Sequence, residues 1–329
     1  MKTLHAKSPC CQGNIYRFGS RRRQCRACGR TWRIRRKKRG RKLKRSTLRL
    51  SGRVFTEYTR IASWAHRQHI SLAAASFRLR GAMKQTLRVR QHRTLPVGHY
   101  ALLGDGLYFK FKHREWVMYL MAVKPAHRHK AFFLEPILLE ERECYERWVK
   151  AIATIPPKVK SRIRAFVSDG FRGSQLLSEQ NHWLHQRCHF HLLAALVRGK
   201  GKRRYRVRGS RVRDKILEAT RIVLSSRNAD VLAQTRKTIL TLVRHPLCPP
   251  YIRKQSLEFL ERERNFRTYL HYPKLNLPTT TSALESAGKL IRRATSTART
   301  PQSVLLRATT FLRLRKSITC NGKSSTKLP

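Results

Sequence analysis

The sequence predicts a mixed α/β fold, and three patterns support this prediction. From residue 99, short apolar runs alternate with charged loops, as in successive β-strands. Further along, apolar positions repeat at helical spacing between two more strand-like runs. A stretch at about 198–276 then shows helical periodicity. With 329 residues, of which 40% are hydrophobic, the chain is long enough for about two to three domains and a buried core.

Positive charge dominates the composition. The chain has 74 Lys and Arg residues against 17 Asp and Glu, which gives a net charge of +57. Self-repulsion of this size favours a polyanionic partner, and we therefore expect nucleic acid. No apolar run approaches the roughly 18 residues of a spanning helix, and the N-terminus lacks the apolar core of a signal peptide. The sequence therefore predicts a cytoplasmic protein with no membrane partner, in which cysteines are metal ligands or buried thiols.

Residues 1–38 are predicted to form a small unit stapled by zinc, a zinc ribbon. Cys25 and Cys28 are two residues apart and precede a glycine, which is typical of one zinc-binding knuckle. The other knuckle is irregular: Ser8 stands where a cysteine is usual, and Cys10 or His5 would replace it. The unit is too short to fold on a hydrophobic core, so a bound metal ion is expected to stabilise it. The alternative is a disordered basic arm with stray thiols. The predicted Zn²⁺ ligands are Cys10, Cys11, Cys25 and Cys28.

Residues 39–95 are predicted to be a basic linker followed by a helix-turn-helix. Arginine and lysine fill residues 33–50, which can lie along a DNA backbone, and Arg21, Arg22 and Arg23 would also face phosphates. Helical periodicity covers 54–69, and a turn is expected at 79–81, before a helix to about residue 90. The alternative is a three-helix packing element with a solvated basic face. The residues expected to enter the major groove are Lys84, Gln85 and Arg88.

Residues 96–320 are predicted to form the main α/β domain, with a flexible tail at 321–329. The strand candidates are 100–103 with 107–111, then 116–123 and 131–139, and the helix at 140–155 ends at two prolines. A fourth strand at 163–167, a helix at 173–180 and a fifth strand from 183 follow. Three strands, helix, strand, helix and strand is the order of a ribonuclease H-like fold, in which the first and fourth strands are neighbours.

Two aspartates follow apolar strand-like runs in this domain. The chain has four Asp in all, and both Asp105 and Asp169 end such a run before a glycine that is expected to break the strand. Because the first and fourth strands are predicted neighbours, these carboxylates would meet at one edge of the sheet. Hard cations such as Mg²⁺ take oxygen ligands, so we interpret the pair as metal-binding carboxylates of a phosphoryl-transfer site. The alternative is two ordinary turn-capping residues.

A long helical insertion separates Asp169 from the last part of the domain. Helices are predicted at 212–224, 230–243 and 252–269, within an insertion at about 198–276. Its first part, 198–213, is basic and is expected to contact DNA. A further helix at 283–291 follows a proline.

Taken together, these features resemble the DDE transposases of bacterial insertion sequences, in the branch akin to Mutator-like elements. The resemblance covers most of the chain, although Ser282 replaces an asparagine of the family pattern and Thr279 stands where arginine is frequent. Four motifs carry it: Gly104-Asp105-Gly106, Ser168-Asp169-Gly170-Phe171-Arg172-Gly173, Gln186-Arg187-Cys188-His189-Phe190-His191, and Pro278-Thr279-Thr280-Thr281-Ser282-Ala283-Leu284-Glu285.

The resemblance implies a function and a catalytic triad. Glu285 would join Asp105 and Asp169 to hold two Mg²⁺ or Mn²⁺ ions, which cut the ends of an insertion sequence and transfer the strands to target DNA. It also implies a homodimer on double-stranded DNA in the bacterial nucleoid. Cys188 and His191 would either support the site or act as a buried thiol and a hydrogen-bonded imidazole, and the sequence leaves both readings open.

Two alternatives from other classes remain at this stage. The first is a non-catalytic, domesticated DNA-binding protein that keeps the ribbon and the helix-turn-helix. The second is an RNA-binding protein of ribosomal type. A binding protein has no use for three converging carboxylates, which favours the enzyme.

Overall fold

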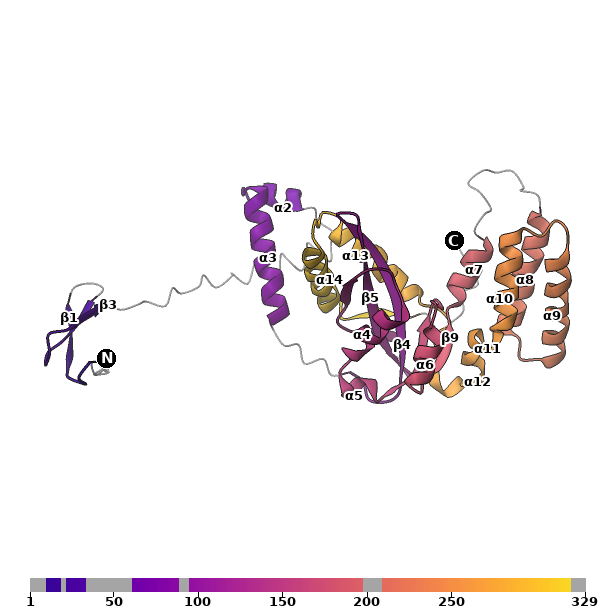
Figure 1. Ribbon diagram of the computed structural model, residues 1–329, viewed down its shortest axis with the longest axis horizontal. Helices are drawn as coiled ribbons and strands as arrows, with labels where there is room; N and C mark the ends of the chain where they lie inside the picture. The colour runs from indigo at the N-terminus through magenta and orange to yellow at the C-terminus, as the bar shows by residue number, and fades with distance from the viewer. Residues whose placement is uncertain (1–9, 19–21, 34–60, 89–94, 198–208, 321–329) are drawn as a thin grey trace. The chain divides into compact units, whose positions relative to one another are not determined.

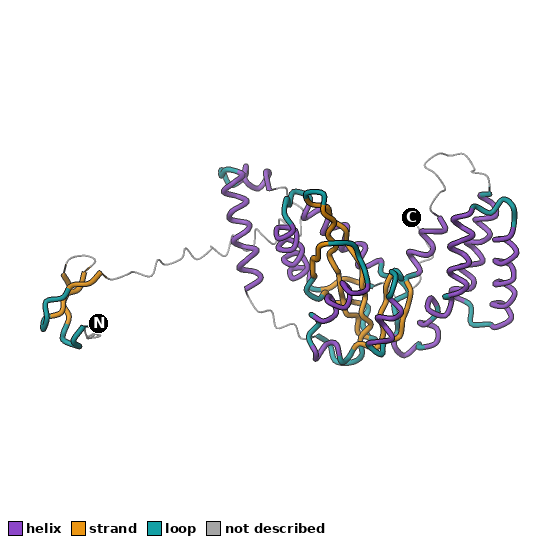
Figure 2. The backbone as a smooth tube through the Cα atoms, in the orientation of Figure 1, coloured by secondary structure: helices purple, strands orange, loops and turns teal. Residues whose placement is uncertain are grey.

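The computed structural model describes residues 10–18, 22–33, 61–88, 95–197 and 209–320. The chain divides into two compact units, Met1–Ser46 and Thr47–Pro329. Figures 1 and 2 show the elements of each unit along the chain.

The N-terminal unit contains a three-stranded antiparallel sheet. Its strands are adjacent in chain order, β1-β2-β3, and Cys25 at the end of β2 is opposite Ile15 at the start of β1. Gly29 adopts a φ of 69° in the turn that leads to β3, a left-handed conformation that glycine accepts without strain. The strands are β1 (Ile15–Phe18), β2 (Arg22–Cys25) and β3 (Thr31–Arg33).

A pair of helices opens the second unit, and it corrects the predicted helix-turn-helix. The helices are α2 (Ile61–Arg67) and α3 (Leu72–Arg88), so the turn lies at 68–71 and the predicted turn at 79–81 is wrong. Leu79 and Met83 are both buried in the main core, and an uninterrupted helix keeps them on one face. Burying them outweighs the roughly 1 kcal/mol cost of a glycine inside a helix. The predicted helical residues 54–60 lie outside the described residues.

A seven-stranded mixed sheet forms the centre of the second unit. Its order is β10-β6-β5-β4-β8-β9, with β7 also paired to β5. The strands β4 and β8 are parallel neighbours, as predicted for the first and fourth strands, and Leu103 is opposite Val167. The strands are β4 (Tyr100–Phe111), β5 (Arg114–Pro125), β6 (Lys130–Phe133), β7 (Ile137–Glu140), β8 (Ile163–Ser168), β9 (Leu184–Arg187) and β10 (Ser317–Thr319).

The strand β4 does not stop at its glycines, contrary to the expected break. It continues through Asp105, which is opposite Leu120 of β5. A Cβ at Gly104 would lie 2.7 Å from Phe166 and 2.8 Å from Trp148, so this glycine serves close packing within an unbroken strand. The predicted strand at 131–139 is likewise divided into β6 and β7, both of which pair with β5.

The two faces of the sheet are covered by different helices. Even-numbered residues of β4, such as Leu102, pack with Trp148 of α4 (Tyr145–Ala153). Odd-numbered residues, such as Leu103, pack with Leu284 of α13 (Ser282–Thr295). Asp105 therefore belongs to the α13 side of the sheet. Other helices around the sheet are α5 (Pro157–Lys160), α6 (Ser174–Gln180), α7 (His189–Val197) and α14 (Pro301–Arg315).

The predicted helical insertion is present, with its own hydrophobic core. Three of its helices lie side by side in Figure 1 and share a buried cluster with Leu192 and Leu196 of α7. The predicted helix at 252–269 is divided into three, and the 3₁₀ helix η1 (Pro273–Leu275) follows. The insertion helices are α8 (Ser210–Ser225), α9 (Ala229–Arg244), α10 (Pro250–Glu261), α11 (Glu263–Phe266) and α12 (Thr268–His271). Among the described residues, no helix is both long enough and apolar enough to cross a membrane.

Candidate active site

The N-terminal unit gathers four thiols that could hold a zinc ion. The Sγ atoms of Cys10, Cys11, Cys25 and Cys28 all lie within 4.8 Å of one another. Cys10 approaches Cys28 at 3.2 Å, and Cys11 approaches Cys25 at 3.2 Å. The donor set fits Zn²⁺, which binds four thiolates tetrahedrally. The adjacent Cys10 and Cys11 both belong to this group, while Ser8 and His5 lie outside the described residues.

A second group of metal-ligating side chains lies at the sheet. Donor atoms of Asp105 on β4, His191 on α7 and Glu285 on α13 all lie within 4.8 Å of one another, so these residues could bind a metal ion. The Nε2 atom of His191 donates to Oε1 of Glu285 at 2.9 Å. Two carboxylates with one imidazole fit Mn²⁺ well and Mg²⁺ through the carboxylates.

Main-chain and thiol contacts fix the two helices that carry His191 and Glu285. The amide of His189, at the start of α7, donates to the carbonyl of Thr279 at 2.8 Å. The Sγ atom of Cys188 is fully buried and accepts from the amide of Thr281 at 3.2 Å and from its hydroxyl at 3.3 Å. Cys188 therefore links the end of β9 to the start of α13, and it also hydrogen-bonds His191 of the group that could bind a metal ion.

The electrostatics of this group depend on burial and on neighbouring carboxylates. Burial of Asp105, together with the charges of Glu285 and Asp169, raises its pKa to about 8. Glu285 shows the opposite shift, because the hydrogen bond from His191 holds its pKa below the usual range. For His191, burial disfavours the imidazolium, but hydrogen bonds to Cys188 and Glu285 outweigh it and raise its pKa. The group thus combines an ionised Glu285 with an Asp105 whose ionised form is disfavoured. A bound divalent cation would stabilise that ionised form.

Asp169 lies beside this group and is not part of it. It follows the end of β8, and its Oδ1 accepts from the amide of Phe171 at 3.1 Å, so the loop holds the carboxylate at the sheet edge. Its charge acts on both Asp105 and His191. The predicted triad is thus brought to one region, but the residue that completes the closest ligand set is His191.

Arg187 lies next to Asp169, and its side chain occupies the space beside Gly170, the residue that follows Asp169. Gly170 has a φ of 89°, and a Cβ there would overlap the guanidinium of Arg187. The Arg187 guanidinium lies over the ring of Phe266 at 4.8 Å, and its Nη1 is 3.6 Å from Oε1 of Glu258 on α10. Arg187 therefore joins the strand edge to the helical insertion.

Replacing Gly170 by alanine is expected to destabilise the protein by about 2 kcal/mol or more, because the backbone is left-handed there and the methyl group displaces Arg187. Thermal unfolding would show this as a lower Tm. Gly98 also has a positive φ but more space, so Gly98→Ala separates backbone strain from the clash. An equal decrease of Tm in both variants would refute the role assigned to Arg187.

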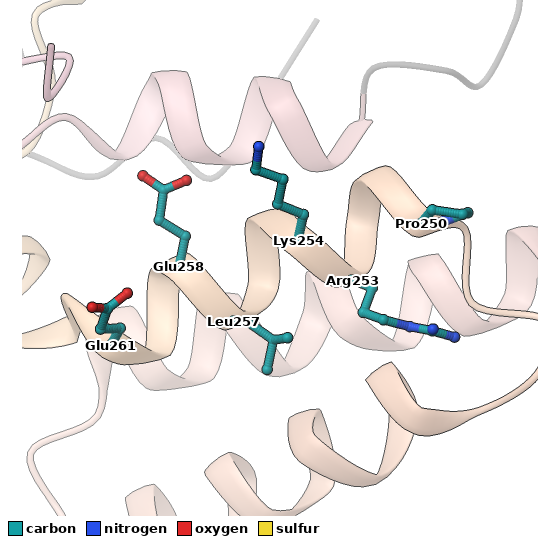
Figure 3. Close-up of a pocket in the computed structure, with 6 residues that line it drawn as sticks. All are labelled: Pro250, Arg253, Lys254, Leu257, Glu258 and Glu261. Carbon is teal, nitrogen blue, oxygen red and sulfur yellow. The ribbon is translucent and has the colours of Figure 1, made fainter. Parts of the chain in front are cut away.

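Two cavities that share Arg187 and Glu258 border this region. One of about 80 Å³ is lined by Asp169, His191 and Arg187, and one of about 800 Å³ is lined by Arg187, the loop at 170–173 and the start of α6. A third pocket, of about 540 Å³, is formed by α10 alone (Figure 3). It shares Glu258 with the other two but is lined by none of Asp105, His191 and Glu285, the group that could hold a metal ion.

The predicted DNA-binding residues are only partly available for contact. Lys84 and Arg88 are exposed on α3, but Gln85 is half-buried with its Oε1 atom enclosed. The helix α3 also packs on α14, where Arg313 donates to the carbonyl of Leu87 at 2.7 Å. This packing gives α3 the role of a core helix as well as a basic surface. In the N-terminal unit, Arg22 is exposed, Arg23 is half-buried, and Arg21 lies outside the described residues.

Sequence reasoning missed several features of the site. It left His191 between two roles and assigned no role to Arg187, which ends β9 shortly before the start of α7. The signal was the motif from Gln186 to His191, which contains both residues. No protein-family model matches the chain, and no curated protein matches it.

Proposed function

We propose that this protein is a DNA transposase of the DDE type, which cleaves the ends of an insertion sequence and joins them to target DNA. One observation carries the proposal: Asp105, His191 and Glu285 converge within 4.8 Å beside Asp169, where the pairing between the parallel strands β4 and β8 ends. Such a carboxylate cluster suits divalent cations, and a net charge of +57 suits DNA. The strand order supports a ribonuclease H-like domain, and the four thiols support a zinc ribbon.

The chain's own residues would prepare the phosphoryl transfer. Bound Mg²⁺ or Mn²⁺ would activate a water or a 3′-hydroxyl and stabilise the leaving oxygen. Asp105 and Glu285 would bind the cation, with Asp169 at its side. His191 keeps Glu285 ionised through their hydrogen bond, and Arg187 supplies a positive charge next to Asp169. A homodimer would hold two DNA ends together.

The test is cleavage of DNA that carries the gene's native flanking sequences. We expect strand cleavage at the element ends with Mg²⁺ or Mn²⁺ and none with EDTA, because the carboxylates act through the cation. DNA affinity should fall steeply with salt, since phosphate contacts dominate. Tight, salt-sensitive binding without cleavage under any cation would refute the proposal and favour a non-catalytic DNA-binding protein.

A further inference from the structure

A fourth carboxylate, that of Glu143, lies against the strand that carries Asp105. Glu143 precedes α4, and its Oε2 atom is 2.7 Å from the position that a Cβ of Gly106 would occupy. The carboxylate therefore fills the space that this glycine leaves open, one residue along β4 from Asp105. Any other residue at 106 would displace it.

Two donors hold the Glu143 carboxylate in place. The hydroxyl of Tyr108 donates to Oε2 at 2.6 Å, and Nε1 of Trp148 donates to Oε1 at 2.7 Å. Trp148 is fully buried and packs on Tyr119 and Phe166, so this donor is rigid. Both oxygens thus have a fixed direction, which is the arrangement expected of a group whose position matters.

Glu143 and Asp105 lie on opposite faces of the middle of β4. Gly106 belongs to the α4 side of the sheet and Asp105 to the α13 side. Pairing between β4 and β8 ends at Leu103 and Val167, so residues 104–106 have no strand beside them on that edge. Asp169 follows β8 at this gap. Although Glu143 lies on the other face, its charge acts on Asp105: burial and the charges of Glu285, Asp169 and Glu143 together raise the pKa of Asp105.

Among the described residues, the charge nearest in kind to a partner for Glu143 is that of His191, which lowers the pKa of Glu143, while burial raises it more strongly. No ion pair joins Glu143 to another residue in the part of the chain that the structure describes. Burial and the charge of Asp169 raise its pKa, while the hydrogen bonds from Tyr108 and Trp148 lower it. A neutral glutamine would fill the same space. The chain has only 17 acidic residues, and a half-buried carboxylate at position 143 is favoured over a glutamine if a cation lies nearby.

We propose that Glu143 is a positioning residue of the candidate metal centre, which acts through its charge, from the α4 side of β4, to raise the affinity of Asp105, His191 and Glu285 for a divalent cation. This inference rests on the metal centre of the proposed function. It adds a residue outside the predicted triad and gives Gly106 a specific role.

The test is a Mn²⁺ titration of the full-length protein without DNA, followed by the rise in Tm. We expect Glu143→Gln to raise the Mn²⁺ concentration at half effect about tenfold, the scale of groups that orient metal ligands. Glu146→Gln removes an exposed carboxylate from the first turn of α4, three residues after Glu143, and should leave the midpoint unchanged. If Glu143→Gln does not fold, Tyr108→Phe removes one donor and should shift the midpoint in the same direction.

The outcomes separate this inference from the proposed function. An unchanged Mn²⁺ midpoint in Glu143→Gln, with a lower Tm in EDTA, would show a merely structural role and overturn the inference while leaving the metal centre intact. A wild-type protein whose Tm does not respond to Mn²⁺ would overturn both. A shifted midpoint with no DNA cleavage by the wild type would support Glu143 and refute the transposase.

Discussion

Replacing Glu285 by glutamine is expected to reduce metal-dependent DNA cleavage by at least about a thousandfold, the upper scale for a single electrostatic group of an active site. Glutamine has the same shape and can still accept the hydrogen bond from His191, but it lacks the charge that binds the cation. Because Glu285 is held ionised by His191, the variant loses a full negative charge at neutral pH. The measurement is the rate of strand cleavage at the element ends with saturating Mn²⁺.

Binding must be measured beside cleavage to interpret this variant. DNA affinity should be unchanged or slightly higher, because removing one carboxylate from a chain of net charge +57 weakens no phosphate contact. Glu218→Gln, which removes an exposed carboxylate from α8, should keep full cleavage. Cleavage by Glu285→Gln at the rate of the control would place the active site elsewhere.

Replacing Asp105 by asparagine is expected to stabilise the metal-free protein. Asp105 is only 8% exposed, and its folded pKa of about 8 lies well above the ordinary value of 3.8. At pH 7.5 the folded state therefore keeps the proton that the unfolded state has lost, at a cost of about 3 kcal/mol after allowance for relaxation. Asparagine avoids this cost, so Tm in EDTA should rise by about 5 °C or more.

The sign of this effect also predicts a pH dependence. Because the folded pKa is raised, the contribution of Asp105 to stability falls as pH increases from about 4 to about 8 and is constant above that. The difference in Tm between Asp105→Asn and the wild type should therefore be small at pH 4.5 and large at pH 8. Mn²⁺ should reverse the order of the two Tm values, because it should stabilise the wild type and not Asp105→Asn. A variant that is less stable than the wild type in EDTA at pH 8 would contradict this account.

Much of the architecture was predictable from local patterns. Alternating strand signals and their order placed β4 beside β8, and the pairing of Leu103 with Val167 confirms that neighbourhood. The helical insertion was equally clear, because amphipathic periodicity persists in any helix that covers its own core. The α/β class was therefore readable from the sequence.

Two predictions that depended on single glycines were wrong, for a common reason. Gly81 was expected to lie in a turn between helices and Gly106 to break a strand, but both lie inside continuous elements, whereas β8 does end before Gly170. In each case neighbouring side chains pack on a core, and packing outweighs the local preference of glycine. At Gly106 the absence of a side chain leaves room for Glu143, a contact that only a distant segment reveals.

The sequence by itself determined the extreme positive charge, the cluster of thiols and the strand order that brings Asp105 near Asp169, because these follow from composition, short spacing and the parallel pairing of two strands. Tertiary structure decided which side chains complete the site. His191 meets Glu285 because Cys188 and Thr281 fasten α7 to α13, and Glu143 reaches β4 because Gly106 leaves room for it. Such contacts join residues far apart in the chain, and no local pattern encodes them.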